Sequence, residues 1–426
     1  MKYSIVTFGC RVNQADSLAI EAELAAGGGE AVSSEHAEIV VVNTCSVTAS
    51  ADQGARQTIR RIARMNPGAK IVATGCYATR CADEVAALPG VVAVIPNDDK
   101  LRSTLGTLGT LGTLEEGPCG RPLAPGLMGR TAWTLRVQTG CEEQCSYCII
   151  PTTRGASRSR TIGDIQAEVA RVVAAGYREI AITGVHLGSY GRDLSPRASL
   201  SELLAKLAGA GYSSGPAEAG PRVLFRVSSL EPMDFPRDIL DLVATPGVAS
   251  GGSSGFTSVG SAGFAPHFHL PLQHASNRIL DLMRRPYSLE YFAGLVDAIR
   301  ARVPHAAIGS DVIAGFPGET DDDFAELVAY LETSPLTHLH VFPYSDRPGT
   351  AASALPDEVH GSVIKGRAQR LREISRALAD GFRAAQRGSV RPALTIEDGT
   401  VAVTDNYFRV AAPAGHPRNE WVEVTL

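Results

Sequence analysis

Short β-branched runs alternate with helical stretches in two separate blocks of this 426-residue chain. In the first block the strand candidates are SIVTF, EIVVVN, KIVAT and VVAVI, with helical patterns at residues 16–26 and 51–65 between them. Strands joined by helices in this way lie parallel, because each helix returns the chain to the same edge of the sheet. Residues 1–98 are therefore predicted to form a Rossmann-like parallel α/β domain.

The second block, residues 131–360, repeats the alternation on a larger scale. Its strand candidates are TLRVQ, EIAIT, VLFRVS, HFHLP, IGSDVIA and HLHVF, and helical patterns occupy residues 162–175, 199–209, 236–244, 276–301 and 320–333. Six βα units predict a partial (β/α)6 barrel of the TIM type. The chemistry of such a barrel is expected where its strands end.

The remaining segments have other compositions. Residues 99–130 contain LGTLGTLGTL and dense Gly and Pro, which predicts a linker, and the Gly/Ser-rich stretches 212–221 and 249–266 read as insertions without an assigned function. Residues 361–390 form a basic helical pattern. After it, residues 391–426 hold the short alternating runs ALTIED, TVAVTD, YFRVAA and EWVEVTL, which predict a small β-barrel.

Bulk composition narrows the class of protein. Hydrophobic residues make up 44% of the chain, no apolar run is long enough to span a membrane, and MKYSIVTFGC reads as a strand rather than a signal peptide. We therefore expect a protein of the reducing cytoplasm, without a membrane partner. Eight cysteines in that setting indicate metal ligands rather than disulfides.

Charge is unevenly distributed. The net charge is −5, yet residues 361–426 hold ten Lys/Arg against seven Asp/Glu, a local +3, so the first 360 residues carry −8. A small basic end on an acidic body is compatible with a local RNA contact.

Three cysteines follow the first strand of the predicted barrel at the spacing C-x3-C-x2-C: Cys141, Cys145 and Cys148. A structural zinc site needs a fourth protein ligand, and the next histidine is His186, so we favour zinc less. The alternative is a 4Fe-4S cluster that uses three thiolates and leaves one iron open. An open metal position is typical of a catalytic site.

A second trio, Cys10, Cys45 and Cys76, looks scattered, but each cysteine follows a predicted strand end. In a parallel sheet those ends share one edge, so three thiolates would converge there. Three unrelated buried cysteines are the alternative. We predict a second cluster, also with one open iron, and treat Cys81 and Cys119 as incidental.

These segments resemble the radical S-adenosylmethionine methylthiotransferases over nearly the whole chain. The similarity is carried by TFGCRVNQADS, VVNTCSVTASAD, GCEEQCSYCIIPTTRG, ITGVHLGSYGRDL and DVIAGFPGET, and VTDNYFRV near the end is similar to the TRAM domain of that family. The segments TFGCRVNQ, NTCSVT and TGVHLGSYG look closest to the subgroup that methylthiolates threonylcarbamoyladenosine next to the tRNA anticodon. Sister groups act on isopentenyladenosine in tRNA or on an aspartate of a ribosomal protein. HLPLQHASNRIL departs from the QSGSD-like stretch usual in the family.

The resemblance implies two 4Fe-4S clusters and S-adenosylmethionine as cofactors. S-adenosylmethionine would occupy the open iron beside Cys141, Cys145 and Cys148. One molecule would methylate a sulfur on the N-terminal cluster, and a second would yield the radical that removes hydrogen from C2 of the adenine. The implied partners are the tRNA anticodon stem-loop and an electron donor of the flavodoxin or ferredoxin type. The sequence does not fix the oligomeric state, and a monomer is expected.

Further site residues are assigned by position. The cofactor candidates lie in the cluster loop or near barrel strand ends, where a turn role is the alternative for each Gly or Ser: Tyr147, Gly184, Ser228, Glu231, Gln273 and Asp311. The RNA candidates are basic or stacking residues, with solvated surface as their alternative: Arg154, Arg158, Arg367, Arg370, Asn406, Tyr407 and Arg409. His186 is a candidate ligand or base, or a satisfied polar residue.

Two functions of other classes remain open at this stage. A radical enzyme acting on a protein side chain would use the C-terminal domain to bind protein instead of RNA, and the basic end argues against it. A noncatalytic iron–sulfur electron carrier would not need the barrel or the open iron.

Overall fold

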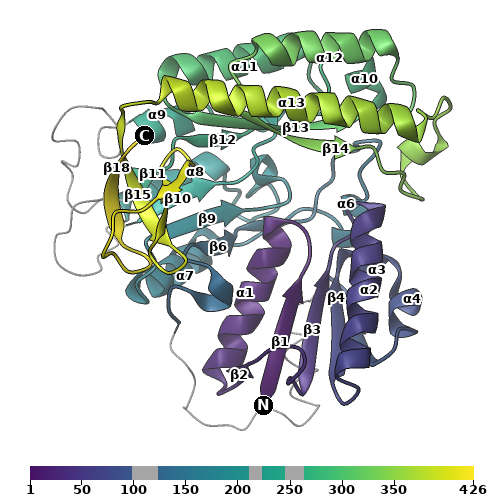
Figure 1. Cartoon of the computed structure of the whole chain (residues 1–426), viewed down its shortest axis with the longest axis vertical. Helices are drawn as coiled ribbons and strands as arrows, with labels where there is room; N and C mark the ends of the chain where they lie inside the picture. Colours follow the sequence, from purple (N-terminus) through teal and green to yellow (C-terminus); the bar gives the residue numbers. More distant parts are fainter. Residues whose placement is uncertain (98–122, 211–222, 245–262) are drawn as a thin grey trace.

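The computed structural model describes residues 1–97, 123–210, 223–244 and 263–426 (Figure 1). Most of the predicted linker, the stretch 212–221, residues 249–262 and Cys119 lie outside the described residues. The described chain forms an N-terminal sheet with its helices, a central partial barrel, and a C-terminal sheet that follows a long helix. Within these residues no helix is long and apolar enough to cross a membrane.

The N-terminal part is a five-stranded parallel sheet with the order β2-β1-β3-β4-β5. All six residues of β3 are buried, as expected for a central strand covered on both faces. The predicted parallel α/β domain is confirmed. Its elements are β1 (Lys2–Thr7), α1 (Arg11–Ala26), β2 (Glu30–Ala31), β3 (Ile39–Thr44), α2 (Ala49–Met65), β4 (Lys70–Gly75), α3 (Cys76–Arg80), α4 (Ala82–Ala86) and β5 (Val91–Ile95).

The central part is a partial barrel of two parallel sheets, β6-β9-β10-β11 and β12-β13-β14. β11 pairs with β10 and β12 pairs with β13, so the single segment that carries β11 and β12 joins the sheets. Pro266 separates these two short strands, because proline has no amide hydrogen for the ladder. The strands are β6 (Trp133–Arg136), β9 (Glu179–Thr183), β10 (Leu224–Val227), β11 (Gly263–Phe264), β12 (His267–His269), β13 (Ala307–Ala314) and β14 (His338–Pro343).

The five predicted helical stretches are present, with two differences: the short helix α6 (Ile150–Arg154) was not predicted, and one predicted helix is divided. The helix expected over residues 276–301 is divided into α10 and α11, because Arg284 has a φ of 56° and Pro286 cannot continue a helix. The helices are α6 (Ile150–Arg154), α7 (Ile162–Ala174), α8 (Leu200–Gly209), α9 (Ile239–Ala244), α10 (Asn277–Leu282), α11 (Leu289–Arg302), α12 (Asp321–Thr333) and α13 (Gly361–Ala385).

Side-chain alternation gives the barrel an apolar outside and a polar inside. Phe225, Phe268 and Val312 belong to the main hydrophobic cluster beneath the helices. Successive strand residues point to opposite faces, so their neighbours line the lumen. The lumen residues include Arg226, His267, His269, Asp311, His338 and His340. This polar lumen is the setting for the candidate site.

The C-terminal part begins with α13, which runs along β14 (Figure 1). It continues as an antiparallel sheet with the order β17-β16-β15-β18, formed by β15 (Val390–Ile396), β16 (Val401–Thr404), β17 (Arg409–Ala411) and β18 (Trp421–Thr425). β17 and β18 are the two edges, so the predicted small β-barrel is instead an open four-stranded sheet. Trp421 packs on Leu224 at the start of β10, which attaches this sheet to the central barrel.

Ion pairs join the N-terminal part to the barrel. Asp16 of α1 pairs with Arg136 at the end of β6. Asp52 of α2 is 4% exposed and accepts hydrogen bonds from Arg80 at 2.6 Å and from Arg347, beyond β14, at 2.9 Å. A carboxylate buried between two guanidiniums leaves both cations uncompensated when it is removed.

We therefore expect Asp52→Ala to lower the free energy of unfolding by about 3 kcal/mol. The exposed pair of Glu84 with Arg56 is the matched control, and Glu84→Ala should cost less than about 0.5 kcal/mol. Urea denaturation midpoints of the two variants measure the difference. Equal midpoints would contradict a buried Asp52 junction.

Candidate active site

The loop that carries the first cysteine trio is fixed by its backbone. It follows β7 (Gln138–Thr139), and Gly140 has a φ of +76°, where a Cβ would fall 1.9 Å from the Ala156 carbonyl oxygen. The amide of Cys141 donates to the carbonyl of Gly155 at 3.0 Å. The Ser146 hydroxyl donates to the carbonyl of Leu282 at 2.7 Å. These contacts hold the loop at the carboxyl end of the barrel strands.

Cys141, Cys145 and Cys148 are free thiols in this loop. Burial raises the pKa of Cys148 to about 12 and also raises that of Cys145, so metal binding there must displace protons. Arg285 donates to the Cys145 sulfur at 3.2 Å, which places a cation beside this sulfur atom. Three soft sulfur ligands and a compensating cation fit an iron–sulfur cluster.

His186 is the imidazole next to this loop. Its Nδ1 lies 3.9 Å from the Cys141 sulfur and its Nε2 lies 3.0 Å from a carboxylate oxygen of Asp234. Burial lowers the pKa of His186, but Asp234 and Cys141 outweigh burial and raise it to about 9. A three-cysteine, one-histidine zinc site would use the same side chains, so iron content distinguishes the two kinds of site.

The predicted cofactor residues near the barrel mouth gather at the carboxyl ends of the strands. Gly184 follows β9, and a Cβ there would lie 2.9 Å from the Gln138 side-chain oxygen. Glu231 pairs with Arg285, the charge partner that the sequence did not name. The backbone amide of Gln273, which has a φ of 70°, donates to the carbonyl of Asp311 at 2.8 Å.

The other two cofactor candidates have apolar or N-terminal neighbours. Tyr147 packs in the small hydrophobic cluster of Met283 and Phe316. Ser228 accepts a hydrogen bond from Arg11 at 3.5 Å, which brings the N-terminal helix α1 to the barrel mouth.

The second trio converges as predicted at one edge of the N-terminal sheet. Cys10 precedes α1, Cys45 follows β3 and Cys76 follows β4. A Cβ on Gly9, with a φ of +87°, would fall 2.4 Å from the Cys45 sulfur, so glycine is required for this approach. Burial raises the pKa of Cys45 to about 11, and the neighbouring Cys10 and Cys76 add to the effect.

Arg154 of α6 lies against this second trio. It is 2% exposed, and it donates to the side-chain oxygen of Asn13 at 2.6 Å. Burial lowers its pKa, but Cys76, Asp16 and Cys10 reverse the effect and raise it. Its Nε is buried and has no hydrogen-bond partner within the described part of the chain. A fixed cation with a spare donor suits a thiolate-bound cluster, whose charge is negative.

The predicted RNA contact of Arg154 is therefore wrong, because the side chain is buried. Arg367 and Asn406 are corrected for the same reason. Arg367 is 7% exposed and pairs with Glu319 at 2.8 Å, and Asn406 is 1% exposed and donates to the carbonyl of His305 at 3.1 Å. The candidates that remain exposed are Arg158, Arg370, Tyr407 and Arg409.

Four residues of this region were not predicted from the sequence. Arg285 and Arg11 are identified only by partners distant in sequence, Cys145 and Ser228. His269 and His340 had a usable signal, since HFH and HLH place histidines at alternate positions, and therefore on one face, of two predicted strands.

Comparisons with known proteins agree with this arrangement. Residues 2–96 match the model described as Uncharacterized protein family UPF0004, and residues 258–331 match the Radical SAM superfamily. The chain is 33% identical to the threonylcarbamoyladenosine tRNA methylthiotransferase MtaB of Bacillus subtilis, over 95% of this chain and 88% of that protein. It is 34% identical to the tRNA-2-methylthio-N(6)-dimethylallyladenosine synthase of Thermobifida fusca, over 89% of this chain and 74% of that protein.

Solved structures show the same fold at low identity. The radical S-adenosylmethionine methyltransferase TsrM of Kitasatospora setae, with cobalamin and a [4Fe-4S] cluster bound, has a TM-score of 0.56 and 15% identity over 83% of this chain and 76% of that chain. The cobalamin-dependent radical enzyme OxsB has a TM-score of 0.50 and 9% identity over 88% and 56% of the two chains.

These ligand sets predict the metal content. Anaerobically reconstituted protein should bind about eight irons, four for each thiol trio. Replacing Cys141, Cys145 and Cys148 together by alanine should leave about four, because the second trio is independent. Cys81→Ala, a free cysteine outside both trios, is the control and should keep all eight. Iron and sulfide assays measure the cluster content. A triple variant that retains its full iron content would exclude a cluster at Cys141, Cys145 and Cys148.

Proposed function

Because the chain belongs to the radical S-adenosylmethionine methylthiotransferases, we propose that it converts N6-threonylcarbamoyladenosine next to the tRNA anticodon into its 2-methylthio derivative. Two relatives named as threonylcarbamoyladenosine tRNA methylthiotransferases are 33% and 34% identical to this chain, over 95% and 96% of its length. The single observation that supports a two-cluster reaction is the pair of free-thiol trios at the ends of parallel strands, joined through α6.

α6 begins two residues after Cys148 and ends at Arg154, which faces Cys76 and Cys10. The helix is five residues long, about 8 Å at 1.5 Å per residue. Asn97 adds a second connection, since its side-chain amide donates to the carbonyl of Thr153 at 2.9 Å and lies 3.6 Å from the Cys76 sulfur. Both trios can therefore serve one substrate atom.

The protein's contribution is placement. When bound, the clusters and S-adenosylmethionine supply a radical that activates a C–H bond and the sulfur that replaces its hydrogen. Cys141, Cys145 and Cys148 hold the first cluster, and Cys10, Cys45 and Cys76 hold the second. Holding both reagents beside the adenine converts an improbable encounter into a local step.

We assign S-adenosylmethionine to the carboxyl ends of the barrel strands. Tyr147, Gly184, Glu231 and Gln273 remain its proposed contacts, whereas the side chains of Ser228 and Asp311 are engaged by Arg11 and by His269 and His340. Glu231 and Arg285 form an ion pair there, so a carboxylate and a guanidinium are available for the amino and carboxyl groups of the methionine.

The RNA surface is proposed along α13 and the neighbouring edge strand. Lys365, Arg372 and Arg376 are exposed and line a groove with Leu339 of β14. Arg158, Arg370, Tyr407 and Arg409 are the exposed candidates retained from the sequence. The anticodon loop is single-stranded, so its base can turn into the barrel without opening a duplex. An electron donor of the flavodoxin or ferredoxin type completes the proposal.

The division of labour between the trios can be tested directly. Cys10→Ala, Cys45→Ala or Cys76→Ala should abolish methylthiolation and preserve reductive cleavage of S-adenosylmethionine, because only the sulfur-supplying cluster is lost. Mass spectrometry of nucleosides and an assay of 5′-deoxyadenosine measure the two activities. Cys81→Ala should keep both. Wild-type methylthiolation in the trio variants would make the second trio structural.

Phosphate contacts along α13 should make tRNA affinity depend on salt. The double variant Arg372→Ala, Arg376→Ala should weaken binding and reduce the slope of log affinity against log salt by about 1.4, or about 0.7 for each lost contact with single-stranded RNA. The exposed arginines of α2 provide a control, and Arg60→Ala, Arg64→Ala should leave the slope unchanged. Filter binding at several salt concentrations tests this, and identical slopes in both variants would place the RNA elsewhere.

A further inference from the structure

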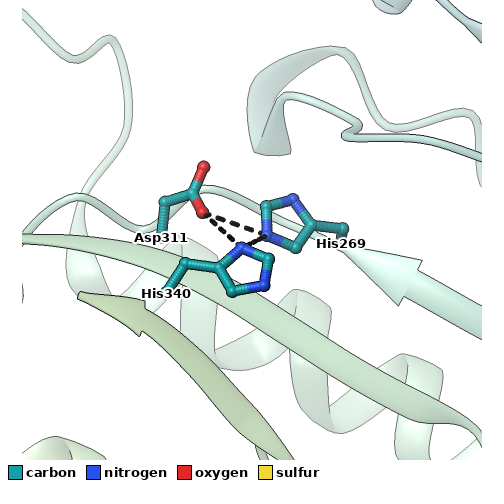
Figure 2. A group of neighbouring side chains, drawn as sticks. All are labelled: His269, Asp311 and His340. Carbon is teal, nitrogen blue, oxygen red and sulfur yellow. Dashed lines mark hydrogen bonds and ion pairs between the residues drawn. The ribbon is translucent and has the colours of Figure 1, made fainter. Parts of the chain in front are cut away.

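Three polar side chains meet inside the barrel lumen, one from each of β12, β13 and β14 (Figure 2). His269 Nε2 and His340 Nδ1 each lie 3.1 Å from one carboxylate oxygen of Asp311, and they lie 3.2 Å from each other. Strand register explains the meeting, because Asp311 pairs with His340 and His269 pairs with Gly309, two residues before Asp311.

The group of His269, Asp311 and His340 keeps hydrogen-bonding capacity for a ligand. The Asp311 oxygen and the two histidine nitrogens form a nearly equilateral triangle, so both imidazoles approach the same oxygen from one side. The second oxygen of Asp311 points away from both rings (Figure 2). The His340 side chain is 55% exposed, which leaves its other nitrogen accessible. His269 is oriented by the Ser229 hydroxyl, 2.7 Å from its Nδ1.

Aromatic contacts extend the trio along the lumen. The His340 ring centroid lies 5.6 Å from that of His338, and His338 stacks with His267 at 6.2 Å. His267 lies 4.5 Å from the ring of Tyr407. His267 is 5% exposed, and among the residues that the structure describes its Nδ1 has no hydrogen-bond partner. A buried nitrogen of this kind costs free energy unless a ligand satisfies it.

Arg11 connects Tyr407, at one end of this row of side chains, to Ser228 at the other. It donates to the Tyr407 hydroxyl at 3.2 Å and to the Ser228 hydroxyl at 3.5 Å, and Ser228 is next to the Ser229 that orients His269. In the part of the chain that the structure describes, no carboxylate lies within ion-pair distance of Arg11. Burial, followed by Arg11, lowers the pKa of Arg130, so a second cation lies close to Arg11.

We propose that this lumen ring, defined as Arg11, Ser228, His267, His269, Asp311 and His340, binds the N6 substituent of the modified adenosine and selects one that carries a carboxylate. The inference rests on the proposed function and adds the residues that choose the substrate. The carboxylate pairs with Arg11. The hydroxyl and the ureido N–H groups of a threonylcarbamoyl substituent pair with the second carboxylate oxygen of Asp311 and with the accessible ring nitrogen of His340.

An isopentenyl substituent would leave these groups unpaired. Sites built to hydrogen-bond a substrate reject analogues that lack the partner by about 10⁴-fold, because buried polar groups then lose water without replacement. The polar lumen therefore favours the carboxylated substituent over the apolar one.

A divalent metal is the competing occupant of the Figure 2 trio. Two histidines and one carboxylate are a known metal-binding set, and ligand atoms around a tetrahedral zinc lie about 3.3 Å apart. Arg11 argues for the organic anion, since a cation without an acidic partner would repel a metal ion. Metal content is therefore measured in the test.

The test compares tRNA anticodon stem-loops that carry threonylcarbamoyladenosine or isopentenyladenosine. His340→Leu should fold, because the side chain is half exposed. We expect kcat/KM for the threonylcarbamoyl substrate to fall at least about tenfold and the preference over isopentenyl to shrink. Cleavage of S-adenosylmethionine and iron content should stay unchanged. His36→Leu, which removes an exposed imidazole that hydrogen-bonds to Ser33, should behave as wild type.

Arg11→Gln is the second variant and should also lose preference for the carboxylated substituent, with iron content checked because Cys10 is adjacent. Equal losses on both substrates, or an unchanged preference in both variants, would overturn the lumen ring while leaving the proposed function intact. A wild-type enzyme inactive on threonylcarbamoyl tRNA would overturn the proposed function itself. A stoichiometric divalent metal that His340→Leu removes from cluster-free protein would reassign the trio as a metal site.

Discussion

The buried guanidinium of Arg154 is the interaction on which the arrangement of the candidate site depends. It extends from α6, directly after the first cysteine loop, into the carboxyl edge of the N-terminal sheet. There it donates a hydrogen bond to the side-chain oxygen of Asn13 and faces the thiols of Cys76 and Cys10. A cation taken out of water is tolerated only where negative charge or strong acceptors surround it. Arg154 therefore orients the two cysteine trios toward one another.

Alternation along the barrel strands provides the second constraint. Residues such as Phe225 and Val312 pack beneath the helices, and the positions between them face inward. In this chain the inward positions on β10, β12, β13 and β14 include Arg226, Asp311 and four histidines, His267, His269, His338 and His340. An interior of that kind is costly for a domain core and is explained by a polar substrate. The docking of Tyr407 against His267 makes the C-terminal sheet part of the same wall.

The sequence predicted the parallel sheet, the six barrel strands and both cysteine trios, because each rests on local pattern. Periodicity identifies strands and helices, and the end of a parallel strand is a defined place. Prediction from the sequence failed where burial decides the role of a polar residue. Arg154, Arg367 and Asn406 look like RNA-binding residues in a linear sequence, and each is enclosed by partners from remote segments.

By itself, then, the sequence determined which elements form and which cysteines share an edge, since spacing and alternation are properties of the local chain. Tertiary structure decided which charges meet. Arg11 reaches Ser228 across 217 positions, and Arg285 reaches Cys145 across 140. Pairings of this range follow from how whole elements pack, and a guanidinium has the same local signature whether its final partner is a thiolate, a carboxylate or water.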